Sequence, residues 1–109
     1  GKAFGEVRVL DGHRLECGGG ASGILVSSSA RDAGIAGLEF LRGIPGTVGG
    51  FVKMNGGAYG REVSSILVDC DVVLPDGRTM TLPASALKYT YRHSELPDGA
   101  IVVAARFEG

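Results

Sequence analysis

The chain has 109 residues, which is enough for a single domain with a modest hydrophobic core. Its 11 basic and 12 acidic side chains give a net charge of −1 without long runs of either sign, which argues against a nucleic-acid partner or a polybasic membrane surface. No apolar run approaches the roughly 20 residues of a membrane span, and two cysteines are too few for a disulfide framework, so we expect a soluble protein of the reducing cytoplasm.

The first predicted elements are two short strands, residues 6–10 and 14–17, in which apolar and polar side chains alternate. Asp11 and Gly12 between them are typical turn residues. A three-residue loop pairs Val9 with Leu15 and Arg8 with Glu16, which puts the apolar residues on one face and the opposite charges on the other. The two strands are therefore predicted to form a hairpin in this register.

The main helix is predicted over residues 21–33, because Ile24, Leu25 and Ser28 recur at helical spacing and Gly34 can end the helix. The segment before it, residues 18–23, loosely resembles a dinucleotide-binding glycine fingerprint. No acidic partner for a ribose follows on a second strand, so we interpret the segment as a tight strand-to-helix turn. Residues 38–41 are expected to form a short buried turn.

Three further elements complete the predicted fold. Residues 64–74 alternate strictly and predict a strand, and the turn at Pro75-Asp76-Gly77 pairs it with the next strand, Val72 opposite Met80 and Cys70 opposite Leu82. Residues 83–87 predict one helical turn, and residues 100–107 predict a last, mostly buried strand. The sum is an α+β domain over residues 1–109, with a mainly antiparallel sheet, one main helix and a glycine-rich loop.

Residues 43–60 form that glycine-rich loop, in which seven of the eighteen residues are glycine and only Lys53 is charged. Glycines allow positive φ and a close approach of the backbone to another body. A run of backbone N–H groups that ends at a short helix can hold phosphate oxygens. A wandering surface loop with several turns explains the composition equally well, because the glycines match no fixed fingerprint.

Two motifs in this part of the chain resemble one enzyme family. Residues 37–50, followed by Met54-Asn55 and residues 57–60, resemble the flavin-binding core of the UDP-N-acetylenolpyruvoylglucosamine reductases. About thirty residues downstream, Tyr91-Arg92-His93-Ser94 is similar to the Tyr-Arg-x-Ser motif of the same family. The resemblance runs from Leu15 to Phe107 and thus covers nearly the whole chain.

The resemblance implies a set of site residues. It assigns Arg92 as the catalytic guanidinium that pairs with the substrate carboxylate, Tyr91 as part of the substrate pocket and Ser94 as support of the local turn. Taken alone, an arginine after a tyrosine is usually a surface cation that covers the aromatic ring. The resemblance also implies that FAD lies along Gly43, Ile44, Pro45, Gly46, Thr47, Val48, Gly49, Gly50, Asn55, Gly57, Ala58 and Ile101.

The family reduces a UDP-N-acetylglucosamine enolpyruvate to UDP-N-acetylmuramate for peptidoglycan, with NADPH as reductant and FAD as hydride carrier. Family members have an earlier lobe and a later segment, which carries a proton-donor serine and a glutamate, so we expect this chain to be the second FAD-binding lobe of a longer enzyme and inactive alone. Two alternatives are another FAD-dependent oxidoreductase of the same superfamily and a non-catalytic nucleotide-binding module.

Overall fold

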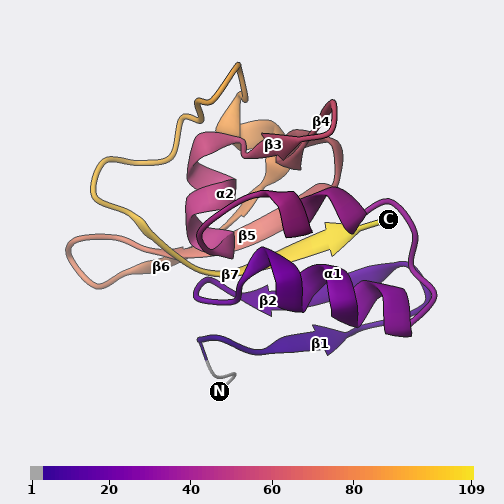
Figure 1. Ribbon diagram of the computed structural model, residues 1–109. Coiled ribbons are helices and arrows are strands. Elements are labelled where there is room, and N and C mark those ends of the chain that lie inside the picture. The colour runs from indigo at the N-terminus through magenta and orange to yellow at the C-terminus, as the bar shows by residue number, and fades with distance from the viewer. Residues whose placement is uncertain (1–3) are drawn as a thin grey trace.

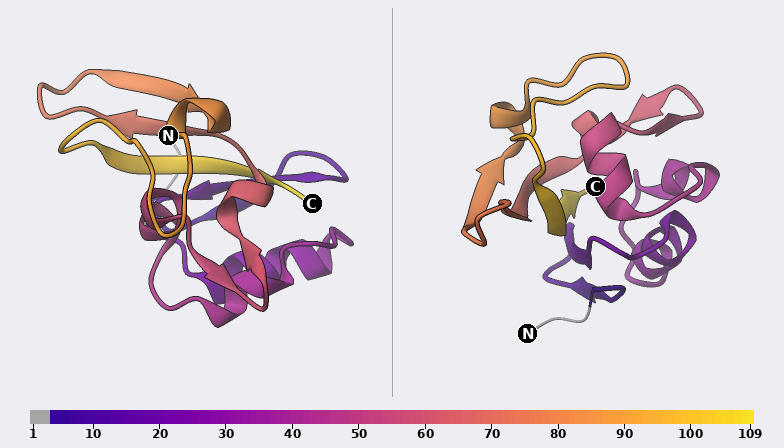
Figure 2. Two further views of the ribbon diagram at one scale, coloured as in Figure 1. Left: turned by 90° about the horizontal axis from the view of Figure 1, so that it is seen from above. Right: turned by 90° about the vertical axis from the view of Figure 1, so that its left-hand side faces the viewer.

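A five-stranded antiparallel sheet, with the strand order β1-β2-β7-β5-β6, forms one layer of the fold in the computed structural model, which describes residues 4–109. Two helices and the short turns pack on one face of this sheet (Figures 1 and 2). The sheet strands are β1 (Val7–Val9), β2 (Arg14–Gly18), β5 (Leu67–Val73), β6 (Thr79–Pro83) and β7 (Ile101–Glu108). The remaining elements are α1 (Gly23–Asp32), α2 (Val48–Met54), the hairpin β3 (Gly57–Ala58) and β4 (Arg61–Glu62), and three 3₁₀ turns, η1 (Glu39–Gly43), η2 (Val63–Ser65) and η3 (Ala84–Leu87).

Both predicted hairpin registers are confirmed. β1 pairs with β2 so that Val9 faces Leu15 and Arg8 faces Glu16, and β5 pairs with β6 so that Val72 faces Met80. The last strand, β7, lies between the two hairpins and joins them into one sheet. Its Phe107 pairs with Leu15 of β2 and with Leu67 of β5, so the C-terminal strand connects the N-terminal hairpin to the hairpin from the middle of the chain.

The strict alternation predicted for residues 64–74 is wrong at the start of β5. A bulge at Val68 places two residues of β5 opposite one residue of β7, where Leu67 pairs with Phe107 and Asp69 with Arg106. Leu67 therefore faces the core together with Cys70, and Val68 does not. The residues before Leu67 belong to the turn η2 and to a link, not to the strand.

The helix α1 forms close to where it was predicted, but it buries a different face. Its buried residues are Gly23, Val26, Ser27 and Ala30, whereas Ile24 is 65% exposed. The helix ends as expected at Gly34, which has φ +74°. The Gly34 N–H donates to the Arg31 carbonyl and the Ile35 N–H to the Ala30 carbonyl, which is the double hydrogen bond of a Schellman motif.

A second α-helix lies inside the glycine-rich loop, where one short helix was expected only as its end. Residues 48–54 form α2 although Gly49 and Gly50 both disfavour helix. The close packing of α2 accounts for Gly49, because a Cβ there would lie 3.3 Å from the Gly19 carbonyl oxygen. The buried side chains of Val48, Phe51 and Val52 hold α2 on the sheet, and this places the whole loop.

The two faces of the sheet differ in chemistry. The face under the helices carries the hydrophobic core, which includes Leu15, Cys17, Cys70, Ala105 and Phe107. The other face carries a row of charges across the strands, which we call the charged ladder: Arg8, Glu16, Arg106, Asp69 and Asp71. Opposite charges alternate along it, so each cation has a carboxylate partner on a neighbouring strand.

Candidate functional site

An open depression of about 380 Å³ lies at the start of the glycine-rich loop. It is lined by Gly43, Ile44, Pro45, Gly46 and Arg42, and by the first residues of α1, Ser22, Gly23 and Ile24. Ser22 caps α1 by accepting a hydrogen bond from the Leu25 N–H at 3.1 Å. The positive end of the α1 dipole and the Arg42 guanidinium both favour a negatively charged group in this depression.

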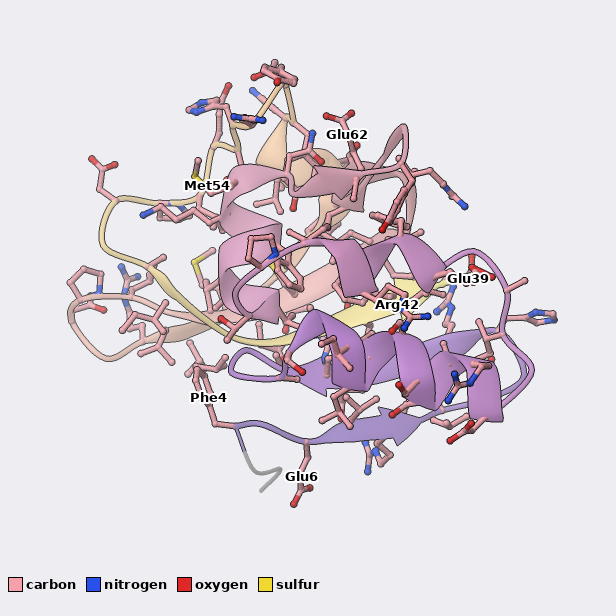
Figure 3. The ribbon with its side chains drawn as sticks, viewed as in Figure 1. Phe4, Glu6, Glu39, Arg42, Met54 and Glu62 are labelled. Atoms are coloured by element: carbon pink, nitrogen blue, oxygen red, sulfur yellow. The ribbon has the colours of Figure 1, made fainter. Side chains whose placement is uncertain are left out.

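Packing requires one glycine of this depression, and a second glycine lies beneath an exposed ring. A Cβ at Gly23 would lie 2.0 Å from the Leu41 carbonyl oxygen, so α1 can approach η1 only with glycine at that position. A Cβ at Gly43 would lie 2.6 Å from the Tyr59 ring, which covers Gly43 and is 80% exposed. In Figure 3, Arg42 and Glu39 lie on the same side of η1, near α1. The walls of the depression are thus backbone and a few side chains, with open space between them.

Two later residues of the predicted FAD-binding set form backbone hydrogen bonds within the protein. The Val48 N–H donates to the Ala21 carbonyl at 2.9 Å and the Gly49 N–H to the Gly19 carbonyl at 2.8 Å. These two amides are therefore engaged within the protein and fix the loop against the turn before α1. The close approach also supports the interpretation of residues 18–23 as a tight strand-to-helix turn, because a Cβ at Gly19 would lie 2.1 Å from the Val102 carbonyl oxygen.

Gly50 differs from the other glycines of α2 and its surroundings. A Cβ at this position would meet no atom within 4 Å, and its φ is not positive. Neither packing nor backbone conformation in the described structure requires glycine here, although alanine would favour the helix by about 1 kcal/mol. A group outside the chain that approaches this backbone closely would account for the glycine.

Arg92 lies at the tip of a tight turn. The N–H and carbonyl groups of Thr90 and His93 bond to each other reciprocally, at 3.1 and 3.2 Å. Arg92 has φ +53°, a left-handed conformation that is uncommon for a residue with a side chain. Its guanidinium lies 5.2 Å from the centre of the Tyr91 ring, which is 77% exposed. The two residues of the predicted substrate site thus project together from this turn.

The Arg92 turn is attached to the C-terminal end of α2. The Tyr89 hydroxyl donates to the Val52 carbonyl at 2.6 Å, and the Ser94 hydroxyl donates to the Lys53 carbonyl at 2.5 Å. Both acceptors are carbonyls of the last helical turn, which have no partner within the helix. Burial raises the pKa of Tyr89, so its phenol stays a donor at neutral pH. Figure 1 shows the turn (orange) above α2, whose lower, N-terminal end follows residues 43–47, the first part of the glycine-rich loop.

Asn55 ends α2 and is only 3% exposed. Its side-chain amide donates to the Thr90 carbonyl at 3.0 Å and to a Glu62 carboxylate oxygen at 3.2 Å, and its oxygen accepts from the Ser64 N–H at 2.9 Å. The side chain is thus occupied by protein groups. Of the other predicted FAD residues beyond α2, Gly57 and Ala58 form β3 next to Asn55.

Ile101 begins β7 and is 60% exposed. It lies next to a second cavity of about 220 Å³, which is lined by Lys53, by residues 93–94 that follow Arg92, and by residues 96–100 that precede Ile101. This cavity therefore lies between Lys53 of α2, the Arg92 turn and the loop that leads into β7. Val102, the residue after Ile101, lies beside Gly49 in the first turn of α2, so the structure places the start of β7 near the N-terminal end of α2 and not at the Arg92 end.

These features suit a flavin dinucleotide. The depression offers a helix N-terminus, a guanidinium and glycine backbone to an anionic pyrophosphate, and Gly50 leaves room for a flat group against α2.

Within residues 4–109, no group of three or more His, Cys, Asp or Glu side chains could hold a metal ion. No helix in that part of the chain is long and apolar enough to cross a membrane.

Comparison with known families agrees with this fit. The FAD binding domain family matches residues 2–83, about three quarters of the chain. The chain belongs to the FAD-binding domain family. FAD is therefore the cofactor of this fold, and the depression and α2 lie inside the matched residues, whereas Tyr91, Arg92 and Ile101 lie outside them.

Individual relatives carry the name of one enzyme. The chain is 73% identical over all of its length to the UDP-N-acetylenolpyruvoylglucosamine reductase of Novosphingobium aromaticivorans and 72% identical to that of Sphingopyxis alaskensis. Among solved structures, the UDP-N-acetylenolpyruvylglucosamine reductase of Thermus caldophilus matches 84% of the chain with 39% identity and a TM-score of 0.77. The chain spans only 37%, 36% and 34% of these three relatives.

Sequence reasoning missed four residues of the depression, namely Ser22, Gly23, Ile24 and Arg42. The serine-glycine pair at the start of α1 was an available signal, because serine is a preferred N-cap and the cap faces the glycine-rich loop. Nothing in the sequence showed that η1 would bring Arg42 beside it. The predicted α+β fold with a mainly antiparallel sheet is confirmed.

Proposed function

We propose that the chain is the second FAD-binding lobe of a UDP-N-acetylenolpyruvoylglucosamine reductase, which forms UDP-N-acetylmuramate with NADPH as reductant for peptidoglycan synthesis in the cytoplasm. One observation carries the proposal: α2 has the anion-favouring depression at its N-terminal end and the Arg92 turn at its C-terminal end. The named relatives support it, at 73% and 72% identity.

FAD held in this site would supply the hydride chemistry between NADPH and the enolpyruvyl group. The chain's own residues would bind the FAD and orient it. The N-terminus of α1 and Arg42 compensate the charge of the pyrophosphate, and the backbone at Gly43, Gly46 and Gly50 allows close contact.

Arg92 has the role of stabilising the substrate carboxylate. Hydride addition to the enolpyruvyl group leaves negative charge on the neighbouring carbon and its carboxylate. A guanidinium stays charged at every relevant pH and offers two parallel donors to that carboxylate, and a turn tied to α2 holds it in place before the reaction. Tyr91 forms part of the pocket wall beside it.

The test is substitution of Arg92 in the full-length protein that contains this chain. Arg92→Ala is expected to lower turnover about 10²- to 10³-fold, as the loss of one preorganised donor does, while FAD stays bound. Arg92→Lys is expected to recover little, because an ammonium lacks the planar pair of donors. Turnover is measured as NADPH oxidation that depends on the enolpyruvyl sugar, and bound flavin by its absorbance.

Arg78→Ala is the matched control. Arg78 is an exposed arginine in the β5–β6 turn, paired with Asp76 at 2.7 Å, and it lines neither the depression nor the second cavity. Its loss removes the same charge and is expected to leave turnover unchanged. Normal turnover in Arg92→Ala would contradict the proposal.

The contact between Arg92 and the Tyr91 ring favours a second candidate, a non-catalytic nucleotide-binding module in which Arg92 only covers the ring. A full-length protein whose flavin is bleached by NADPH excludes this candidate, and a protein without flavin supports it. A third candidate, another FAD-dependent oxidoreductase of the same superfamily, is separated by a panel of substrates offered to the reduced protein.

A further inference from the structure

Asn55 forms hydrogen bonds with three groups, of which the Thr90 carbonyl lies 35 positions away in the sequence. Its side chain joins the end of α2 to the Thr90 carbonyl of the Arg92 turn, to Glu62 of β4 and to the Ser64 N–H of η2. The residue has φ +50°, a conformation that asparagine tolerates better than most residues with a side chain. It is also buried, so water does not compete for these hydrogen bonds.

The surroundings of Asn55 specify an amide. The nitrogen faces two acceptors, Thr90 and Glu62, and the oxygen faces one donor, Ser64. An aspartate would have the same shape and could still accept from the Ser64 N–H. It would nevertheless place a negative oxygen against a carbonyl and a carboxylate, and a buried polar atom without its partner costs about 1–3 kcal/mol.

The Thr90 carbonyl is the link to Arg92. This oxygen accepts the His93 N–H that closes the turn, and it also accepts the Asn55 amide. Arg92, between these two residues, has the left-handed φ that persists only where the surroundings determine it. Tyr89 and Ser94 attach the flanks of the turn to α2 by one bond each, whereas Asn55 acts on the closing bond itself.

We propose that Asn55 is a positioning residue for Arg92: through the Thr90 carbonyl it holds the tight turn in the orientation that presents the guanidinium to the substrate carboxylate. The inference rests on the proposed reductase function and on the role of Arg92 in it. It assigns the side chain of Asn55 a role apart from contact with FAD.

The main test is Asn55→Asp in the full-length flavoprotein, with the two half-reactions measured separately. Reduction of the flavin by NADPH does not involve the enolpyruvyl carboxylate, so its rate is expected to be unchanged. Reoxidation of the reduced flavin by the enolpyruvyl sugar is expected to slow about 10- to 100-fold, because a displaced catalytic group costs that much. Equal slowing of both half-reactions, or of neither, would overturn the proposal.

A second variant separates positioning from simple stability. The variant combines Asn55→Asp with Glu62→Gln. The glutamine amide can donate to the new aspartate, so the repulsion between two carboxylates is gone. The Thr90 carbonyl still lacks the hydrogen bond that Asn55 donated. We expect the unfolding temperature to recover and the reoxidation rate to stay low. Recovery of both together would show a structural role only and would overturn the proposal.

A double-mutant cycle with Arg92→Ala keeps this proposal distinct from the proposed function. If Asn55 acts through Arg92, Asn55→Asp has little further effect on reoxidation once Arg92 is alanine. If Arg92→Ala has a large effect and Asn55→Asp adds an independent effect to it, only the positioning role of Asn55 is rejected. If Arg92→Ala has no effect, the proposed function is rejected. Thr81→Val, which removes one hydrogen bond to Asp71 on the opposite face of the sheet, is the control and is expected to change neither half-reaction.

Discussion

Gly50 and Gly49 are neighbours in α2 and yet have different reasons to be glycine. Gly49 packs against the Gly19 carbonyl oxygen, and a Cβ there would lie 3.3 Å from it. Gly50 faces open space within the described structure. The fold explains the first glycine. We expect contact with the flavin to explain the second, so the pair tests where the flavin lies.

Gly50→Ala is expected to have opposite effects on stability and on FAD affinity. Without flavin, the variant should be more stable by about 0.5–1 kcal/mol, since alanine favours helix and meets no neighbour. With flavin, the added methyl group should clash and weaken binding. Chemical denaturation of the flavin-free protein and fluorescence titration with FAD measure the two effects. Unchanged FAD affinity would show that the cofactor lies elsewhere.

At single residues, the resemblance pointed to Arg92 and Tyr91, and their roles stay predictions. The structure adds that the Arg92 guanidinium lies over the Tyr91 ring on one turn. The buried network of Asn55 could not be foreseen, because its partners lie up to 35 positions away and only the folded chain brings them together. Ile24 was expected on the buried face of α1 because it is apolar, but it lines the depression.

Among the elements, the charged ladder is the feature with a measurable dependence on pH. Arg106 of β7 donates to Asp69 and Asp71 of β5 and to Glu16 of β2, and it is largely covered by them. Hydrogen bonds from the Arg106 guanidinium lower the pKa of Asp71 below its ordinary value of 3.8. The pair therefore stabilises the folded state only while Asp71 is ionised.

The sign of the pH dependence follows from this lowered pKa. The contribution of Asp71 is fully present well above pH 3.8, the ordinary value, and is lost as the pH falls below it through the lower value of the folded state. Asp71→Asn is expected to cost about 1 kcal/mol at neutral pH, because the pair is partly exposed, and to cost less at acidic pH. Urea unfolding of both proteins at several pH values measures this. A constant difference at all pH values would contradict it.

The hairpins were predictable and the bulges were not. In each hairpin, a short turn with glycine and alternating apolar residues allowed only one register that keeps the charges on the outer face. The bulge at Val68 depends on how β5 meets β7, a strand more than thirty residues away. Helix α2 was foreseen only as the short helix ending the loop, because its two glycines weaken the local signal and its stability comes from packing on the sheet.

At the scale of the whole molecule, exposed apolar side chains surround the candidate site. Ile24 lines the depression, Tyr59 covers Gly43, Tyr91 stands beside Arg92, and Ile101 begins β7 next to the second cavity. The depression is open to solvent, and the chain spans about a third of the length of its named relatives. We therefore expect the site to be one wall of a larger pocket, which other parts of a longer protein would complete.

The chain alone is therefore expected to fold but not to catalyse. Its core includes large side chains that are fully buried without help from other chains, such as Phe107, Leu15 and Leu41. Residues 1–109 should show a cooperative unfolding transition by circular dichroism. The same sample should show no NADPH oxidation that depends on the enolpyruvyl sugar. Turnover by the isolated chain would contradict the view that the catalytic pocket is incomplete.

The position of β7 affects how the protein forms during synthesis. The sheet is centred on a strand that leaves the ribosome only after all its neighbours, and it pairs with β2, some ninety positions earlier. Until residues 101–108 emerge, the nascent polypeptide holds two separate hairpins with open edges, which attract other strands. Ribosome stalling before residue 101 should therefore yield aggregation-prone intermediates that chaperones retain, and the domain would close in a single late step.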